Sequence, residues 1–252
     1  MTRIIMTGCN GKMGKTISEI VAEDEEAVIV AGVDISEGTR DYPIYKKISD
    51  VKEEADVVID FSTPKLLDEI LSFAIEKQMP TVLCTTGYSA EQIEQINQTA
   101  NQTALLRSAN MSLGINIMIK VMETVAKTLA DTGFDIEIVE RHHNQKLDAP
   151  SGTALALADA INKELDNDYD YKYDRSTLRE KRPKKEIGIS AVRGGTIVGE
   201  HEIIFAGTDE VIEFKHTAYS KAIFGKGAVE AAKFLKGKQT GLYDMKDVIG
   251  EG

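Results

Sequence analysis

The segment ERHHNQKLDAPSGTA, residues 140–154, brings together side chains that can transfer protons and bind anions. His142 can donate a proton near neutral pH, and Lys146 can hold an anionic group or help to protonate a carbanion-like position. The Ser-Gly-Thr turn that follows supplies hydroxyls and backbone N–H groups suited to a carboxylate. Each residue alone also suits a surface loop or a helix cap. Their combination favours a site for a small anionic substrate.

A metal site is the first alternative for this segment. His142 and His143 are consecutive, so on a strand their side chains point to opposite faces and do not easily share one ion. His201 and His216 fall on separate expected strands, without the close pair spacing of a zinc site. We therefore expect no metal. With two cysteines in the chain, neither a disulfide framework nor a four-cysteine zinc site is available.

The N-terminal elements point to a bound nucleotide. A short apolar strand at residues 4–6 leads into a glycine turn at residues 8–14, a helix from Lys15 and a second strand that ends at Asp34. This order is typical of a dinucleotide-binding unit. Glycines let the backbone approach a pyrophosphate at the helix N-terminus, and Asp34 would accept hydrogen bonds from a ribose. The spacing Gly-x-x-Gly-x-x-Gly also allows a plain turn without a cofactor.

Strands continue to alternate with helices as far as residue 112, which predicts an α/β fold with a Rossmann-like, doubly wound parallel sheet. Ligands of such sheets lie beyond the carboxyl ends of the strands. Besides the turn and Asp34, Phe61-Ser62-Thr63 marks one such end. The residues that we expect to bind the cofactor are Gly8, Cys9, Asn10, Gly11, Lys12, Met13, Asp34, Cys84, Thr85, Thr86, Ser108, Ala109, Asn110 and Met111.

A second domain follows. The earlier alternation is replaced by two helices, three or four strands and a charged stretch expected to be a loop or flap, which favours an α+β domain. The tail is expected to be helical and then irregular, and to return to the first domain. The expected organisation is 1–112 with 222–252 as the dinucleotide-binding domain and 113–221 as the substrate-binding domain.

Composition narrows the class of protein. A hydrophobic fraction of 42% with 28% charged residues is ordinary for a globular protein. The net charge of −11 argues against nucleic acid as a partner. We expect no membrane span, because no apolar run approaches the length of about 18 residues that one needs, and we see no signal peptide. A cytoplasmic protein is therefore expected.

Seven motifs are spread along nearly the whole chain: GCNGKMG, DFSTP, CTTG, NMSLGIN, ERHHNQKLDAPSGTA, VRGGTIVGEHEIIF and GLYDMKDV. Together they resemble the 4-hydroxy-tetrahydrodipicolinate reductase (dihydrodipicolinate reductase) family of lysine and diaminopimelate biosynthesis. The run from His142 to Thr153 is the most specific part of the resemblance.

The resemblance implies a homotetrameric NADH- or NADPH-dependent enzyme whose second domain makes the tetramer. Hydride would reach C4 of a small cyclic dicarboxylate as its hydroxyl leaves as water. His142 matches the proton donor of the family and Lys146 its partner. The residues that match the groups holding the substrate carboxylates are His143, Ser151, Gly152 and Thr153.

Two positions depart from the family pattern. Lys221 stands where members often have arginine, and lysine cannot form the same bidentate fork. Ile35 follows Asp34 where members that use NADPH often have a basic residue, which favours NADH, although Lys12 could reach a 2′-phosphate.

Two other hypotheses for the function remain. One is a nicotinamide oxidoreductase acting on a semialdehyde, and the other is a redox-sensing regulator, for which the basic stretch 172–185 is the best support.

Overall fold

The computed structural model describes residues 1–250 and divides into two compact units. The first comprises Met1–Leu113 and the chain from Ala222 onward, and the second comprises Gly114–Lys221. These units differ from the expected ranges by one residue, Leu113.

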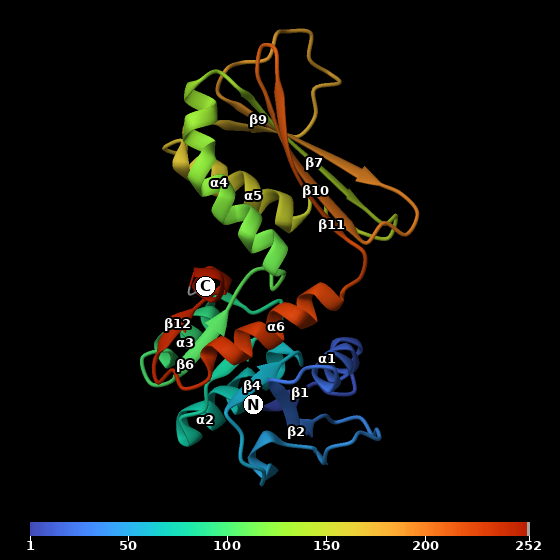
Figure 1. Ribbon diagram of the computed structural model, residues 1–252, viewed down its shortest axis with the longest axis vertical. Coiled ribbons are helices and arrows are strands. Elements are labelled where there is room, and N and C mark those ends of the chain that lie inside the picture. Colours follow the sequence, from blue (N-terminus) through green and yellow to red (C-terminus); the bar gives the residue numbers. More distant parts are fainter. Residues whose placement is uncertain (251–252) are drawn as a thin grey trace. The chain divides into compact units, whose positions relative to one another are not determined.

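Within residues 1–250, the first unit is built on a seven-stranded parallel sheet (Figure 1). From β1 the chain moves outward in one direction to β2 and β3, and in the other to β4, β5, β6 and β12. The topological switch point therefore lies between β1 and β4, and the expected doubly wound sheet is confirmed. In spatial order the strands are β12 (Gly241–Tyr243), β6 (Ala104–Arg107), β5 (Thr81–Leu83), β4 (Val57–Asp60), β1 (Thr2–Thr7), β2 (Ala27–Val33) and β3 (Ile44–Tyr45).

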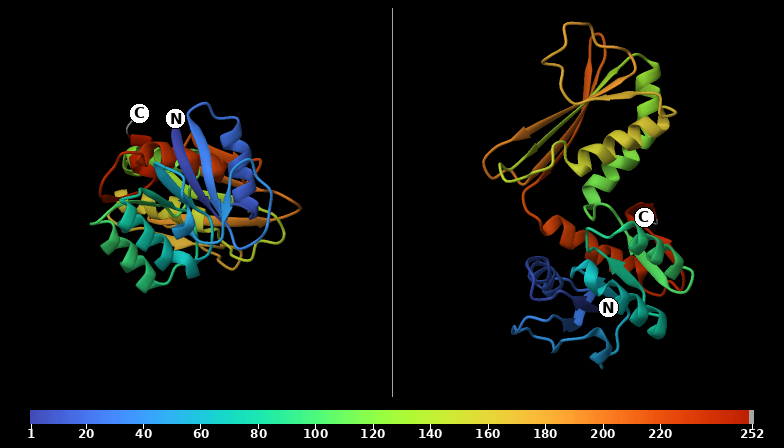
Figure 2. Two further views of the ribbon diagram at one scale, coloured as in Figure 1. Left: turned by 90° about the horizontal axis from the view of Figure 1, so that it is seen from below. Right: turned by 180° about the vertical axis from the view of Figure 1, so that it is seen from behind.

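Helices cover both faces of this sheet (Figure 2). Because side chains alternate along a strand, Ile4 of β1 packs in the core beneath α1 and α6, whereas its neighbour Ile5 packs in the core beneath α2. The strands are therefore apolar throughout, as the sequence indicated. The helices of this unit are α1 (Lys12–Ala22), α2 (Leu67–Lys77), α3 (Ala90–Thr99), α6 (Ala222–Leu235) and α7 (Met245–Gly250), with 3-10 turns at Ile48–Asp50 and Pro64–Leu66.

The second unit is a mixed sheet, five-stranded in the described chain, with α4 (Leu113–Asp131) and α5 (Gly152–Glu164) packed on one face. Buried and partly exposed residues alternate along β7 and β10, so each strand presents one face to these helices. In spatial order the strands are β11 (Val211–Ala218), β10 (Gly199–Ala206), β7 (Asp135–His142), β9 (Glu186–Arg193) and β8 (Asp170–Lys172).

Two expectations about local structure are wrong. The tail is not irregular after its helix, because β12 pairs with β6 at the edge of the first sheet. The charged stretch is not all loop, because β8 pairs with β9. Two of its arginines also have partners: Arg175 binds Glu186, and Arg182 binds Asp135. These two arginines are thus held by acids of the second sheet, which weakens the support that the basic stretch gives to a redox-sensing regulator.

The described residues contain neither a membrane-spanning helix nor a cluster of metal ligands. No helix among them is both long enough and apolar enough to cross a membrane. No group of three or more histidine, cysteine, aspartate or glutamate side chains among them could hold a metal ion.

Candidate functional site

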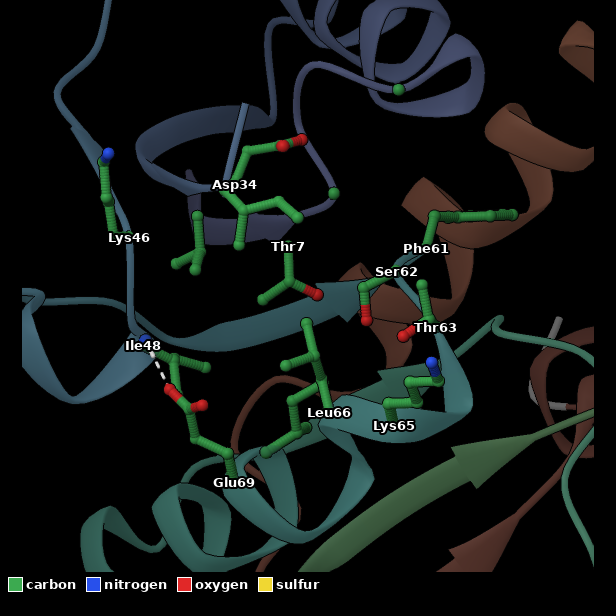
Figure 3. Close-up of a pocket in the computed structure, with 15 residues that line it drawn as sticks. Thr7, Asp34, Lys46, Ile48, Phe61, Ser62, Thr63, Lys65, Leu66 and Glu69 are labelled. Carbon is green, nitrogen blue, oxygen red and sulfur yellow. Dashed lines mark hydrogen bonds between the residues drawn. The ribbon is translucent and has the colours of Figure 1, made fainter. Parts of the chain in front are cut away.

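A cavity of about 510 Å³ opens at the carboxyl ends of β1, β2 and β4, next to the switch point of the first sheet (Figure 3). Its position is the one that doubly wound sheets use for ligands. It is lined by Thr7, Gly8, Gly11, Val33, Asp34, Ile35, Lys46, Ile48, Phe61, Ser62, Thr63, Lys65, Leu66, Glu69 and Ile70.

The glycines of the turn are required by close backbone packing. Gly8 has a φ of +76°, and a Cβ there would lie 2.4 Å from the carbonyl oxygen of Phe61. A Cβ on Gly14 would lie 2.2 Å from the oxygen of Gly8. Gly14 lies inside α1, because this helix begins at Lys12 rather than at the expected Lys15. Gly11 caps this helix without a side chain, so the first-turn N–H groups suit a pyrophosphate.

Asp34 holds the turn in place. One carboxylate oxygen accepts the backbone N–H of Asn10 at 2.9 Å, and the other accepts that of Ser36 at 2.8 Å. A carboxylate has about four acceptor positions, so two remain to receive a ribose diol. Asp34 thus fits the role expected from the sequence, and it has a second role in shaping the loop.

A buried carboxylate lies next to the cavity. Asp60, the last residue of β4, is fully buried. It accepts hydrogen bonds from the hydroxyls of Thr7 and Ser62, each at 2.5 Å, and of Thr85 at 2.7 Å. These bonds link the carboxyl ends of β1, β4 and β5 to one another. Thr85 was among the expected cofactor residues, but Asp60 was not, because a single acid after an apolar run gives no sign of its partners.

The other residues expected to bind the cofactor differ in how far their side chains are buried. Cys9, Cys84 and Met111 have buried side chains in the core, and burial raises the pKa of the Cys9 thiol to about 11. Met13 points toward Gly225 of α6. Such residues could touch a cofactor through their backbone. Thr86, Ala109 and Lys12 are exposed, and the Ser108 hydroxyl bonds the carbonyl oxygen of Asn110.

Two cations of the cavity were not expected. Lys46 and Lys65 line it, whereas Lys12 was the cation expected to reach a 2′-phosphate. Lys65 directly follows the DFSTP motif, and Lys46 directly follows β3. A two-residue strand such as β3 is too short to recognise by periodicity, which explains why Lys46 was missed.

A group of ionisable side chains lies on the face of the second sheet that packs against α4 and α5. It begins where the buried residues of this face change from apolar to polar. Along β7 the buried positions Ile136 and Ile138 are followed by Glu140 and His142. On the paired strand β10, Ile203 lies opposite Ile138, and His201 lies opposite Glu140. The strand register thus extends the hydrophobic core directly into a group of ionisable side chains.

Glu140 is the centre of this cluster and is fully buried. Its carboxylate accepts two hydrogen bonds of 2.7 Å from the Arg193 guanidinium, one of 3.0 Å from the backbone N–H of Ser151, and lies 2.6 Å from Nδ1 of His142. Burial tends to raise the pKa of the Glu140 carboxyl. The hydrogen bonds from Arg193 and His142 outweigh burial and hold this pKa below its ordinary value.

His201 packs edge-on against His142, with ring centroids 5.1 Å apart. Burial, followed by the nearby charge of His142, lowers the pKa of His201 to about 4. His201 is therefore neutral near pH 7. Its Nε2 lies 3.0 Å from the Ser151 hydroxyl, which also accepts the backbone N–H of Ala154 as the cap of α5. The hydroxyl of Ser151 is thus engaged inside the protein.

The loop after β7 carries the cation of the motif. The Lys146 ammonium lies 2.9 Å from the Asp148 carboxylate, and the Lys146 side chain is 22% exposed. Nδ1 of His143 is buried without a hydrogen-bond partner among the described residues. Gly152 and Thr153 stand in the first turn of α5. The structure therefore brings His142 and Ser151 together around Glu140 and places the Lys146–Asp148 pair in the loop between them.

Family models match both units of the chain. The model described as dihydrodipicolinate reductase, N-terminus, matches residues 2–111, and that described as dihydrodipicolinate reductase, C-terminus, matches residues 114–249.

Curated relatives and a solved structure agree with these matches. A 4-hydroxy-tetrahydrodipicolinate reductase from Caldanaerobacter subterraneus subsp. tengcongensis is 51% identical over 252 residues, covering 100% of both chains. One from Clostridium novyi is 48% identical, covering 99% of this chain and 98% of the relative. The structure of a dipicolinate-bound dihydrodipicolinate reductase from Paenisporosarcina sp. TG-14 is 25% identical, with a TM-score of 0.82 over 98% of this chain and 99% of that one. The resemblance noted in the motifs is thereby confirmed: this chain belongs to the dihydrodipicolinate reductase family.

Proposed function

We propose that this protein reduces 4-hydroxy-tetrahydrodipicolinate to tetrahydrodipicolinate with NADH or NADPH, in lysine and diaminopimelate biosynthesis. The observation that carries this function is the full-length similarity to reductases of that name, together with a nucleotide cavity in one unit and an acid-and-cation cluster in the other. The reaction takes one hydride and one proton and releases one water.

The residues of the second unit divide into an acid and an anion-binding group. His142 is the proton donor, and Lys146 is the cation that meets a ring carboxylate and assists the proton transfer. His143, Gly152 and Thr153 bind carboxylate oxygens, and Ser151 shapes this site as the cap of α5. The N-terminus of α5, a helix of 13 residues, supports this assignment, because helix N-termini favour negative charge.

The first unit supplies the cofactor site. NADH or NADPH brings the hydride when bound. The α1 N-terminus holds the pyrophosphate and Asp34 the adenine-side ribose, while Lys46 and Lys65 add positive charge to the cavity. The remaining expected residues, from Cys84 to Thr86 and from Ser108 to Met111, border the cofactor at the ends of β5 and β6.

Asp34→Asn tests the ribose assignment. We expect the Kd of NADH to rise roughly tenfold, the effect of losing one hydrogen bond to a charged group. The Kd of NADPH should rise less, because its 2′-phosphate leaves no free diol for the carboxylate. Calorimetric titration measures both constants, and Glu37→Gln, at an exposed acid of the same loop, is the matched control. An equal rise in the Kd values of NADH and NADPH would show that Asp34 does not bind the ribose.

A substrate comparison tests the activity itself. We expect NADH oxidation in the presence of the cyclic hydroxy-dicarboxylate and little oxidation with open-chain semialdehydes. The reason is that Lys146 and the α5 N-terminus suit two carboxylates on one ring. Steady-state assays at equal substrate concentrations make the comparison, and a preference for the semialdehyde would replace the proposed function by the alternative reductase.

We further propose a cytoplasmic homotetramer assembled through the second unit. The support is the family resemblance, together with the packing of α4 and α5 on one face of that sheet, which leaves the other face available for another copy of the chain.

A further inference from the structure

The contacts of Glu140 determine which atom of His142 carries a proton. Arg193 and the backbone N–H of Ser151 can only donate, and together they engage both oxygens of the Glu140 carboxylate. A carboxylate held by these donors stays ionised, and an ionised carboxylate can only accept. The 2.6 Å contact with His142 therefore requires that Nδ1 carry the hydrogen.

The other ring nitrogen of His142, Nε2, lies beside a glycine, Gly199. A Cβ on Gly199 of β10 would lie 3.2 Å from Nε2 of His142. Glycine thus leaves room beside Nε2 that any other residue would narrow. With Nδ1 committed to Glu140, Nε2 is the nitrogen that remains to hold and release a proton.

We propose that Glu140 is a positioning residue that fixes the ring orientation and tautomer of His142, so that Nε2 donates the proton. This inference rests on the proposed function, in which His142 is the acid. Glu140 does not contact substrate. Arg193 acts together with Glu140, because its guanidinium balances the charge of the Glu140 carboxylate. Arg193 also donates a hydrogen bond of 2.5 Å to the carbonyl oxygen of Asp148. Arg193 therefore connects Glu140, and through it His142, to the loop that carries Lys146 and Asp148.

The test uses Glu140→Gln and the double variant Glu140→Gln/Arg193→Met, both in the full-length chain. The double variant removes both charges, so no unpaired guanidinium remains in a mostly buried place. Glu137→Gln is the matched control, because it removes an arginine-paired carboxylate of the same strand on the opposite face. Thermal unfolding verifies that each variant is folded.

The first readout is the ring nitrogen spectrum of 15N-histidine-labelled protein without substrate, with His142 assigned by its loss in His142→Gln. We expect wild type and Glu137→Gln to carry the hydrogen on Nδ1 in the neutral ring. Both Glu140 variants should shift toward the Nε2–H tautomer. A purely structural role for Glu140 would leave this tautomer unchanged.

The second readout is steady-state kinetics. We expect kcat to fall about tenfold in both Glu140 variants, with the KM for NADH unchanged, because Glu140 lies outside the unit that holds the nucleotide cavity. An unchanged tautomer or an unchanged kcat in both folded variants overturns the proposal. If wild type fails to reduce the cyclic dicarboxylate, the proposed function falls instead, and the tautomer alone decides whether Glu140 positions the ring.

Discussion

His142→Gln should lower kcat by roughly 10²–10⁴-fold, the usual contribution of a positioned acid. Glutamine retains a hydrogen-bonding side chain beside Glu140 but cannot deliver a proton. Since His142 is buried and surrounded by polar groups, the fold should survive with a modest loss of stability. Steady-state kinetics with the cyclic dicarboxylate measure the effect.

The control for this variant is cofactor affinity. His142 belongs to the second unit, so calorimetry should find the Kd of NADH unchanged. Turnover close to wild type in a folded variant that binds NADH normally would show that the proton comes from elsewhere, and the assignment of His142 as acid would be abandoned.

Lys146→Met should weaken binding of dipicolinate, a planar pyridine dicarboxylate, by roughly 10–150-fold. The reason is the loss of one charge-assisted hydrogen bond, worth about 1.5–3 kcal/mol. Methionine keeps the apolar stem of the side chain, so packing should change little. If Lys146 only binds the carboxylate, KM rises and kcat is mostly retained. If it also assists proton delivery, kcat falls as well.

Two comparisons make the Lys146 result specific. Lys163→Met carries the same substitution at an exposed lysine of α5 and should leave inhibitor affinity unchanged. The hydrogen bond from Lys146 also holds the pKa of Asp148 below its ordinary value, so this pKa should rise in Lys146→Met. A raised Asp148 pKa with unchanged KM, kcat and inhibitor affinity would confirm the ion pair and exclude Lys146 from the site.

The parts of the fold that the sequence predicts are those with a long periodic signal. The apolar runs of β1 and β4 and the alternation in β7 are sufficient to identify buried and half-buried strands. β8 (Asp-Tyr-Lys) and β12 (Gly-Leu-Tyr) are missed because three residues without an apolar run give no strand signal. Each exists through pairing with another strand, β9 and β6 respectively. Gly14 was expected in the glycine turn, whereas it lies inside α1, which begins at Lys12.

The site was predictable only to the extent that its residues are neighbours in sequence. His142, Lys146 and Ser151 fall within one motif, whereas Arg193 reaches Glu140 from 53 residues away. Glu140 did carry a signal, since it lies two residues before His142 on an alternating strand and so shares its face. Its function depends on Arg193, and one sequence does not reveal a partner that the β7–β9 pairing brings near.

The return of the chain to the first unit has a consequence during synthesis on the ribosome. Ala228 and Val229 of α6 are buried in the core that β1 and β4 also line, and Gly227 packs tightly against the carbonyl oxygen of Met111. At a translation rate of about 5–20 residues per second, the inserted unit Gly114–Lys221 takes roughly 5–20 s to make. During that interval the nascent first unit has an apolar sheet face without α6. The inserted unit, being continuous, is free to fold before the unit that began ahead of it.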